Sequence, residues 1–356
     1  MTTPLAQPAE SGDPEKWPFL FEWLNKVWAD PSELQRDTYI HWLKVGYISC
    51  LAGKPKPGQA IFISGPTGSG KTLLNRRVHG AIFGKTSDSS EYLLGRTAFN
   101  KENCESFIWA IDDTKGAIHF EDKEALASNI KKHVANPEVR CEAKGRDSFE
   151  IPWTGRIAVT CNQDLRSLQI VPVLDDSTVD KFLLLSWNCW KPTFGEYGSK
   201  EEVIRAEVPH LCKYLVEWKP PAEVLGEDRY GVKPFHHASM LRSVQASSPK
   251  ARITELLDAL IDAEPAKNNV KASLSEISNW LSMVPSARRL METEFGKQRL
   301  HMAMEEAGYR RSWQGNSPRF LLVKSDQIFN SEENKAIQTE RYARAKPNGM
   351  RGSETK

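Results

Sequence analysis

A glycine-rich run in the first quarter of the sequence carries the residue types that hold a nucleoside triphosphate. It follows the apolar residues 60–63 and matches G-x-x-x-x-G-K-T at every fixed position. The run comprises Gly65, Pro66, Thr67, Gly68, Ser69, Gly70, Lys71 and Thr72. Glycines let backbone N–H groups converge on a phosphate, Lys71 can reach the β- and γ-phosphates, and the Thr72 hydroxyl can bind Mg²⁺. The complete match favours ATP or GTP binding over an ordinary turn between a strand and a helix.

Two carboxylates, Asp112 and Asp113, directly follow the apolar stretch 107–111. A core strand ending here would place acid groups beside the bound phosphates. Asp112 is then expected to hold Mg²⁺ together with Thr72, and Asp113 to polarise the attacking water. The alternative is a solvated turn after a buried strand, which the glycine run upstream disfavours.

An amide side chain, Asn162, comes at the end of the strand-like stretch 156–161. Next to the acidic strand, this amide can hydrogen-bond the γ-phosphate or position the water, which is a sensing role. Asn also favours turns for reasons of its own. Its order after the glycine run and the acid pair gives the sensing interpretation its weight.

A basic turn lies between these two strands. Residues 139–151 alternate on both sides of a Lys-Gly-Arg-Asp turn, which predicts a hairpin with Lys144 and Arg146 at its tip. In a ring of subunits such tips would meet a nucleic-acid backbone and supply sequence-independent charge. A merely solvated turn is the alternative. Trp153, just after the hairpin, is a candidate for base stacking, whereas most tryptophans are expected in the core.

The elements that must position these groups follow from the alternation of apolar and polar residues. Strands and helices alternate after the glycine run, as in an α/β domain with a mostly parallel sheet. Three helical stretches and two short strands near the carboxyl end are typical of a winged helix. The expected organisation is disorder over 1–15, a helical oligomerisation segment over 16–58, an ATPase core over 59–220, a connector over 221–249, a winged-helix-like domain over 250–329 and a disordered tail over 330–356.

Composition excludes some classes of protein. The chain has 356 residues, 40% of them hydrophobic, and a formal net charge of +2, so nucleic-acid binding must come from local basic clusters. Its six cysteines lie far apart in the sequence, which disfavours zinc sites and favours a reduced interior. With no apolar run long enough for a membrane span and a polar start, the protein is expected in the cytoplasm, that of the host cell if a phage encodes it.

These motifs together resemble the superfamily 3 helicases, specifically the phage and plasmid primase-helicase type with an AAA+-like core. The resemblance rests on residues 65–72, 111–113, 144–146, 159–162, 170–182 and 229–237. It implies an ATP-hydrolysing DNA helicase that acts as a ring, usually a hexamer, with ATP and Mg²⁺ bound at subunit interfaces. Such a ring threads one strand of single-stranded or forked DNA in the 3′ to 5′ direction during replication.

The resemblance departs from the family at the arginine finger. Members often have an Arg-Phe pair where this chain has Lys181 followed by Phe182. Lys cannot reproduce the two-pronged donation of Arg, although its charge can still stabilise the γ-phosphate. Arg166 and Arg229 are the other candidates for this trans-acting role.

Two further expectations concern function. About 60 residues precede the glycine run, too few for a priming or nicking domain. A primase or initiator is therefore expected from another protein, or from residues outside this sequence. The alternative function is a nucleic-acid-binding ATPase switch or defence protein that assembles with ATP without unwinding, because the same motifs encode hydrolysis and not motion. A small-molecule nucleotide kinase fits poorly, since no Arg-rich lid is evident.

Overall fold

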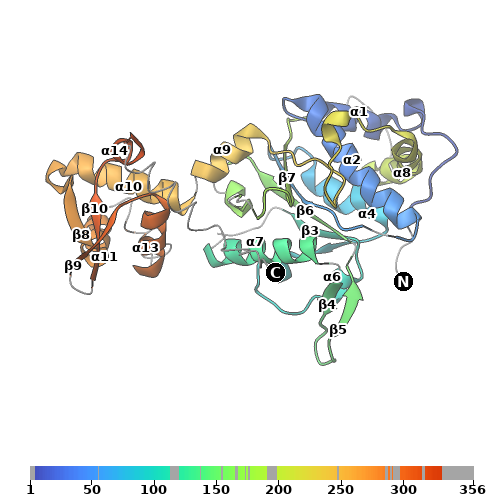
Figure 1. Cartoon of the computed structure of the whole chain (residues 1–356). Helices are drawn as coiled ribbons and strands as arrows, with labels where there is room; N and C mark the ends of the chain where they lie inside the picture. The colour runs from blue at the N-terminus through green and yellow to red at the C-terminus, as the bar shows by residue number, and fades with distance from the viewer. Residues whose placement is uncertain are drawn as a thin grey trace, which may run out of the picture. The chain divides into compact units, whose positions relative to one another are not determined.

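The computed structural model divides into two compact units, residues 1–245 and 246–356 (Figure 1). The described residues are 5–54, 56–112, 120–136, 138–153, 155–164, 167–172, 174, 177–190, 199–246, 248–284, 288, 291, 297–314 and 317–330. Within this part of the chain, no helix is both long and apolar enough to cross a membrane.

The first unit is built on a five-stranded parallel sheet with the order β2-β3-β6-β1-β7. The strands are β1 (Ala60–Gly65), β2 (Thr86–Asp88), β3 (Ile108–Asp112), β6 (Arg156–Asn162) and β7 (Phe182–Ser186). Every residue of β1 and β7 is buried. Strands covered on both faces have near-continuous apolar sequences, which is why these runs stood out. The structure confirms the predicted α/β class with a parallel sheet.

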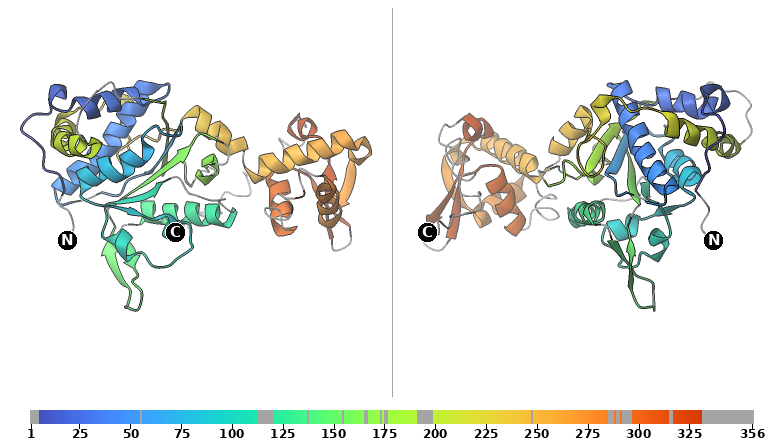
Figure 2. Two further views of the ribbon diagram at one scale, coloured as in Figure 1. Left: turned by 180° about the vertical axis from the view of Figure 1, so that it is seen from behind. Right: turned by 45° about the vertical axis from the view of Figure 1, so that its right-hand side comes forward.

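Aromatic helices cover one face of the sheet. These are α1 (Pro18–Lys26), α2 (Ser32–Leu51), α4 (His79–Phe83) and α8 (Lys200–Glu217), with the short turns Pro14–Lys16 and Ala222–Val224 beside them. Figures 1 and 2 show them together on the side of the sheet away from α7. The apolar side chains of the segment 16–58, which was expected to be helical and to serve oligomerisation, lie in this core of their own unit. Oligomerisation through its outer face stays a prediction.

Helices α5 (Ser90–Leu93), α7 (Phe120–Ala135) and α9 (Ala238–Ala246) lie on the other face, and α6 (Lys101–Cys104) lies near β2. Trp153 belongs to this second core and is only 4% exposed. It packs on Trp109 with ring centroids 4.3 Å apart. The base-stacking interpretation of Trp153 was therefore wrong, because a large apolar side chain after a hairpin also serves to fix the hairpin to the core.

Residues 5–13, for which disorder was expected, lie along the first unit. The Ala6 amide donates to the Ile82 carbonyl at 2.9 Å, and the Tyr47 hydroxyl donates to the Ala6 carbonyl at 2.6 Å. The Ala9 amide donates to the Pro209 carbonyl at 2.9 Å. A polar composition predicts disorder, but these partners are distant in the sequence, so only the fold brings them to the segment.

The stretch expected as a connector, 221–249, completes the sheet edge. The Leu184 amide of β7 donates to the Phe235 carbonyl, and the His237 amide donates to the Leu184 carbonyl, both at 2.8 Å. Residues 235–237 thereby cover the open edge of β7, which would otherwise expose unpaired backbone groups. The division between the units falls within α9, at residue 245.

The second unit has its own core and a three-stranded antiparallel sheet of order β8-β10-β9. Its elements are α10 (Pro249–Ala263), a short turn at Pro265–Lys267, β8 (Val270–Ser273), α11 (Leu274–Met283), α13 (Lys297–Glu306), β9 (Arg311–Gln314), β10 (Ser317–Leu322) and α14 (Ser325–Asn330). A capping box between Ser273 and Glu276 starts α11. The strand β8 and the helix α14 were not predicted. The tail expected to be disordered lies outside the described residues.

Candidate nucleotide and nucleic-acid site

The glycine run connects β1 to the short helix α3 (Lys71–Leu73). Gly68 and Gly70 have φ angles of 78° and 91°, in the left-handed region that side chains disfavour. A Cβ atom at either position would meet nothing within 4 Å, so the backbone angle and not crowding requires glycine there. This curled loop leads directly into the helix that carries Lys71.

Oxygen atoms surround the ammonium group of Lys71. Its Nζ donates to the carbonyls of Gly65 at 2.9 Å and Pro66 at 2.8 Å, and to Asn162 Oδ1 at 3.0 Å. The residue is 6% exposed. A buried charge needs such partners, because its water shell has been removed. The structure thus brings together Lys71 and Asn162, as β1 and β6 pair with Gly65 opposite Asn162.

Asp112 ends β3 on the far side of β6. Its Oδ1 accepts a hydrogen bond from the Thr160 hydroxyl at 2.7 Å, and the two residues face each other in the strand register. Arg76 Nε lies 3.8 Å from Asp112 Oδ2, and its side chain is 64% exposed. Arg76 sits on a π-helical turn, Leu74–Val78, that continues from α3. Such turns are frequent at functional sites.

The sequence reasoning missed Arg76 and Thr160. Arg76 had no usable local signal, because five positions after Lys71 is not the i+3 or i+4 spacing that places two side chains on one helix face. Thr160 belongs to the 159–162 motif, but its role was not predicted, because only the pairing of β3 with β6 makes it the partner of Asp112. The predicted residues Asp113 and Arg166 lie outside the described residues.

A carboxylate and a hydroxyl are hard oxygen ligands of the kind that Mg²⁺ takes. Asp112 and Thr72 therefore fit the predicted metal site by chemistry, with Asp112 largely buried and Thr72 exposed. In the described part of the chain, no group of three or more His, Cys, Asp and Glu side chains gathers as a metal site would. A cation here would thus depend on phosphate oxygens and water for its other ligands, as is usual for Mg²⁺.

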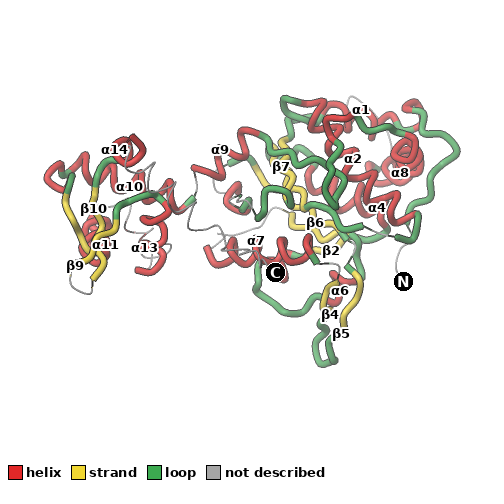
Figure 3. Tube along the Cα trace, viewed as in Figure 1, coloured by secondary structure: helices red, strands yellow, loops and turns green. Residues whose placement is uncertain are grey.

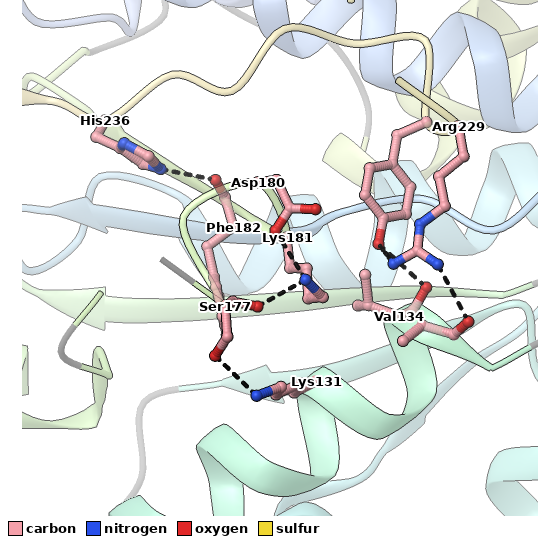
Figure 4. Close-up of polar contacts among 10 residues, drawn as sticks. Lys131, Val134, Ser177, Asp180, Lys181, Phe182, Arg229 and His236 are labelled. Atoms are coloured by element: carbon pink, nitrogen blue, oxygen red, sulfur yellow. Dashed lines mark hydrogen bonds and ion pairs between the residues drawn. The ribbon is translucent and has the colours of Figure 1, made fainter. Parts of the chain in front are cut away.

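Lys181, shown in Figure 4, directly precedes β7 and so lies at the edge formed by the amino ends of the strands. Lys71 lies at the opposite edge, formed by their carboxyl ends. The far end of β7 pairs with Ser64 at the glycine run. At about 3.3 Å of rise per residue, the strand separates the two edges by roughly 15 Å. Lys181 Nζ donates to the Ser177 carbonyl at 2.6 Å and to Asp180 Oδ1 at 2.8 Å. This separation excludes a catalytic role for Lys181 at the glycine run of its own subunit.

Two more cations lie at the same edge in Figure 4. Lys131 Nζ donates to the Ser177 hydroxyl at 2.7 Å. Arg229 donates to the Tyr230 hydroxyl at 2.6 Å and stacks over the same ring, with its guanidinium carbon 4.8 Å from the centroid. This edge therefore presents positive groups whose orientation is set by short polar contacts.

The predicted hairpin is present as β4 (Glu138–Cys141) and β5 (Phe149–Pro152). Figure 3 shows it extending away from the central sheet. Its turn has Gly145 at φ 70°, and Lys144 and Arg146 on either side are exposed. The structure thus confirms the basic tip, while its ligand stays a prediction.

The base of the hairpin is fixed by a neighbouring loop. The Asn100 side chain donates to the Arg140 carbonyl at 2.8 Å and accepts from the Glu142 amide at 2.7 Å. Phe99 and Phe149 are 51% and 54% exposed. Among the described residues, they are the aromatic members of the set of exposed large hydrophobic side chains. Phe99, Arg140 and Arg146 line one open hollow of about 790 Å³ beside the tip. The sequence reasoning had missed both phenylalanines, because exposure depends on tertiary packing.

Comparison with known proteins gives a fold and a partial family match. A model of a family of unknown function, DUF5906, matches residues 62–178. No match is found among proteins of curated function. Two apo structures of the C-terminal region of NrS-1 (305–718) are similar to this chain, with TM-scores of 0.52 and 0.54 and identities of 14% and 13%. Each similarity covers 89% of this chain and 77% of the other. At identities this low, the similarity shows a likeness of fold alone. A structure of JCV helicase is also similar, at a TM-score of 0.29 and 14% identity over 63% of this chain and 61% of the other.

Proposed function

We propose that this chain is an ATP-hydrolysing DNA helicase that works as a ring, most simply a hexamer, in the replication of a phage, plasmid or mobile element. The observation that carries the proposal is the hydrogen bond from Lys71 to Asn162, with Asp112 on the next strand. Three polar groups distant in the sequence thus lie at the carboxyl edge of one parallel sheet. This edge is where open α/β sheets bind their ligands.

The residues of this edge divide the work of ATP hydrolysis. Backbone N–H groups of the glycine run bind the phosphates, and the Lys71 ammonium exchanges protein oxygens for those of the β- and γ-phosphates. Thr72 and Asp112 would hold Mg²⁺, which supplies positive charge to the phosphates. Asp113 accepts a proton from the attacking water, and the Asn162 amide positions that water.

The trans-acting cation comes from the opposite edge of a neighbouring subunit in this proposal. Lys181 and Arg229 lie at that edge, and Arg166 is the third candidate from the sequence. Among these candidates, the geometry favours Arg229 as the trans-acting cation. Its guanidinium is already held over the Tyr230 ring, so it loses little conformational freedom when it contacts a phosphate. ATP then binds between subunits, so hydrolysis depends on assembly.

The hairpin grips single-stranded DNA. Lys144 and Arg146 neutralise phosphates, and the exposed ring of Phe149 offers a face on which a base can stack. The described part of the second unit has four helices and a three-stranded antiparallel sheet. We propose that it acts as a winged helix and adds a second DNA contact. A primase or initiator acts as a separate partner.

The test compares ATPase rates with and without single-stranded DNA, and measures particle mass on the same samples by mass photometry. The wild type is compared with a variant carrying Lys144→Ala and Arg146→Ala. A matched control carries Lys219→Ala and Lys233→Ala, which removes the same charge from exposed positions away from the hairpin. The expected result is strong stimulation on a six-subunit particle, lost in the hairpin variant and kept in the control.

The alternative is an ATPase switch or defence protein that assembles with ATP without unwinding. It would show assembly that depends on ATP, with no displacement of a strand from a forked duplex. An unstimulated rate on a monomer or dimer would contradict the helicase proposal. Equal stimulation of the hairpin variant and its control would contradict the role of the hairpin alone.

A further inference from the structure

A small aromatic pocket lies directly beside the glycine run. Its volume is about 190 Å³, and it is lined by Gly68–Gly70 of the loop. It is also lined by α1 and by the segment after β7, through Phe19, Trp23 and Trp190. The sequence motifs and the proposed hydrolysis residues do not account for these aromatic side chains.

The aromatic wall is held in place by the core. Trp23 is 5% exposed and meets the Trp187 ring edge-on at a centroid distance of 5.8 Å. Trp190 is half-buried, lies 5.7 Å from the Phe19 ring, and donates its indole N–H to Glu22 Oε1 at 3.3 Å. A pocket whose rings are already ordered loses little freedom when a flat ligand enters it.

The position of the pocket identifies which part of a nucleotide it would take. Its floor is Leu73 and Leu74, the residues after Lys71 and Thr72 on the loop helix. A ligand whose phosphates bind the glycine run therefore extends toward this floor. The Ser69 hydroxyl is a further sign of a ligand, since Ser69 is 4% exposed and its Oγ has no hydrogen-bond partner in the described part of the chain. Buried hydroxyls in native proteins nearly always have a partner.

We infer that this pocket binds the base of the nucleoside triphosphate by stacking and apolar enclosure. The inference rests on the proposed function and adds the base subsite to it. Aromatic and aliphatic carbon forms most of the wall, and Lys200 is the charged side chain among the described lining residues. The helical segment before the glycine run is distant in sequence from the hydrolysis residues. Through α1 it nevertheless becomes part of the proposed substrate site.

The test measures equilibrium binding of ATP and of inorganic tripolyphosphate to the full chain by calorimetry. Trp190→Ala removes the half-buried ring, and Trp218→Ala is the matched control, because Trp218 is also half-buried but does not line the pocket. From the strength of base stacking on aromatic rings, Trp190→Ala is expected to weaken ATP about 5–150-fold. Its affinity for tripolyphosphate should not change.

A second variant covers the case in which loss of Trp190 harms the fold. Leu73→Trp adds a ring at the floor and fills the pocket, so it too should weaken ATP and spare tripolyphosphate. Suppose that the wild-type protein binds both compounds. If the variants then weaken the binding of ATP and tripolyphosphate equally, or weaken the binding of neither, the base pocket is overturned while nucleotide binding stands. If wild-type protein binds neither compound, the proposed function fails and takes the base pocket with it.

Discussion

The ammonium group of Lys71 lies 3.0 Å from the amide oxygen of Asn162, although 91 positions separate the two residues in the sequence. The parallel pairing of β1 with β6 creates this relationship by setting Gly65 opposite Asn162. The lysine that we propose to bind phosphate is therefore in direct contact with the amide that we propose to sense it. Any ligand that attracts the lysine must also change the environment of the amide.

Lys71→Ala is expected to reduce ATP hydrolysis to background. Asn162→Ala should lower kcat about 10²–10³-fold, the typical cost of removing one well-placed polar group from a reacting centre. Steady-state rates at saturating ATP measure both single losses. Because Lys71→Ala leaves no measurable rate, the coupling is read from ATP affinity by calorimetry, where the double variant should bind ATP no more weakly than Lys71→Ala. If the two single losses in affinity simply multiply, Lys71 and Asn162 work independently.

Thr160→Val should impair ATP hydrolysis, although Thr160 itself is not proposed to contact the nucleotide. The Thr160 hydroxyl is the hydrogen-bond donor to Asp112, and hydrogen bonds to charged groups are worth about 1.5–3 kcal/mol. We expect a loss of about tenfold or more in kcat and a higher Mg²⁺ concentration for half-maximal rate. Thr160→Ser keeps the hydroxyl and serves as the control. A Mg²⁺ titration that is the same for the two variants would exclude the positioning role.

Phe149→Ala should weaken binding of single-stranded DNA about 5–150-fold through lost stacking. The slope of log affinity against log salt concentration should stay as in the wild type, because no charge is removed. Lys144→Ala should instead reduce the magnitude of that slope by about one phosphate contact. Fluorescence anisotropy over a salt series separates the two effects, with Phe149→Tyr as the conservative control. A changed slope for Phe149→Ala would argue against stacking.

Stability should fall as pH is lowered below about 6.5, the ordinary pKa of histidine. Burial lowers the pKa of His133 to about 4 and that of His79 to about 3. Below pH 6.5 the unfolded chain therefore takes up protons that the folded chain refuses, and the free energy of unfolding drops by about 1.4 kcal/mol per pH unit for each histidine. The loss is complete once pH falls below the folded pKa values.

Urea denaturation at pH 7.5 and pH 5, followed by tryptophan fluorescence, measures this dependence. His133→Gln should lower the absolute stability, because it disturbs packing on Trp109. It should also lose roughly 2 kcal/mol less than the wild type between the two pH values. An identical pH dependence in the variant would show that His133 is not neutral in the folded protein.

Local patterns predicted much of the core, and their failures have a common cause. The strands around Gly65, Asp112 and Asn162 were predictable because a buried parallel strand is an unbroken apolar run. The hairpin was predictable from alternation around a turn. Trp153 was misjudged because its sequence neighbours do not reveal that Trp109 and His133 pack on it. Residues 5–13 and 235–237 were misjudged because their partners are far away in the chain.

By itself, the sequence determined which chemical groups are available. Lys71 and Thr72 directly follow a glycine-rich loop and Asp112 ends an apolar strand, and local backbone geometry is enough to predict both. The tertiary structure decided which groups meet. Strand order placed β6 between β1 and β3, so that Asn162 reaches Lys71 and Thr160 reaches Asp112. It also removed Lys181 to the far edge and brought Trp23 and Trp190 to the glycine run. The physical reason is that hydrogen-bonded strand pairing and burial of apolar faces act between residues of any separation, whereas a motif records only neighbours.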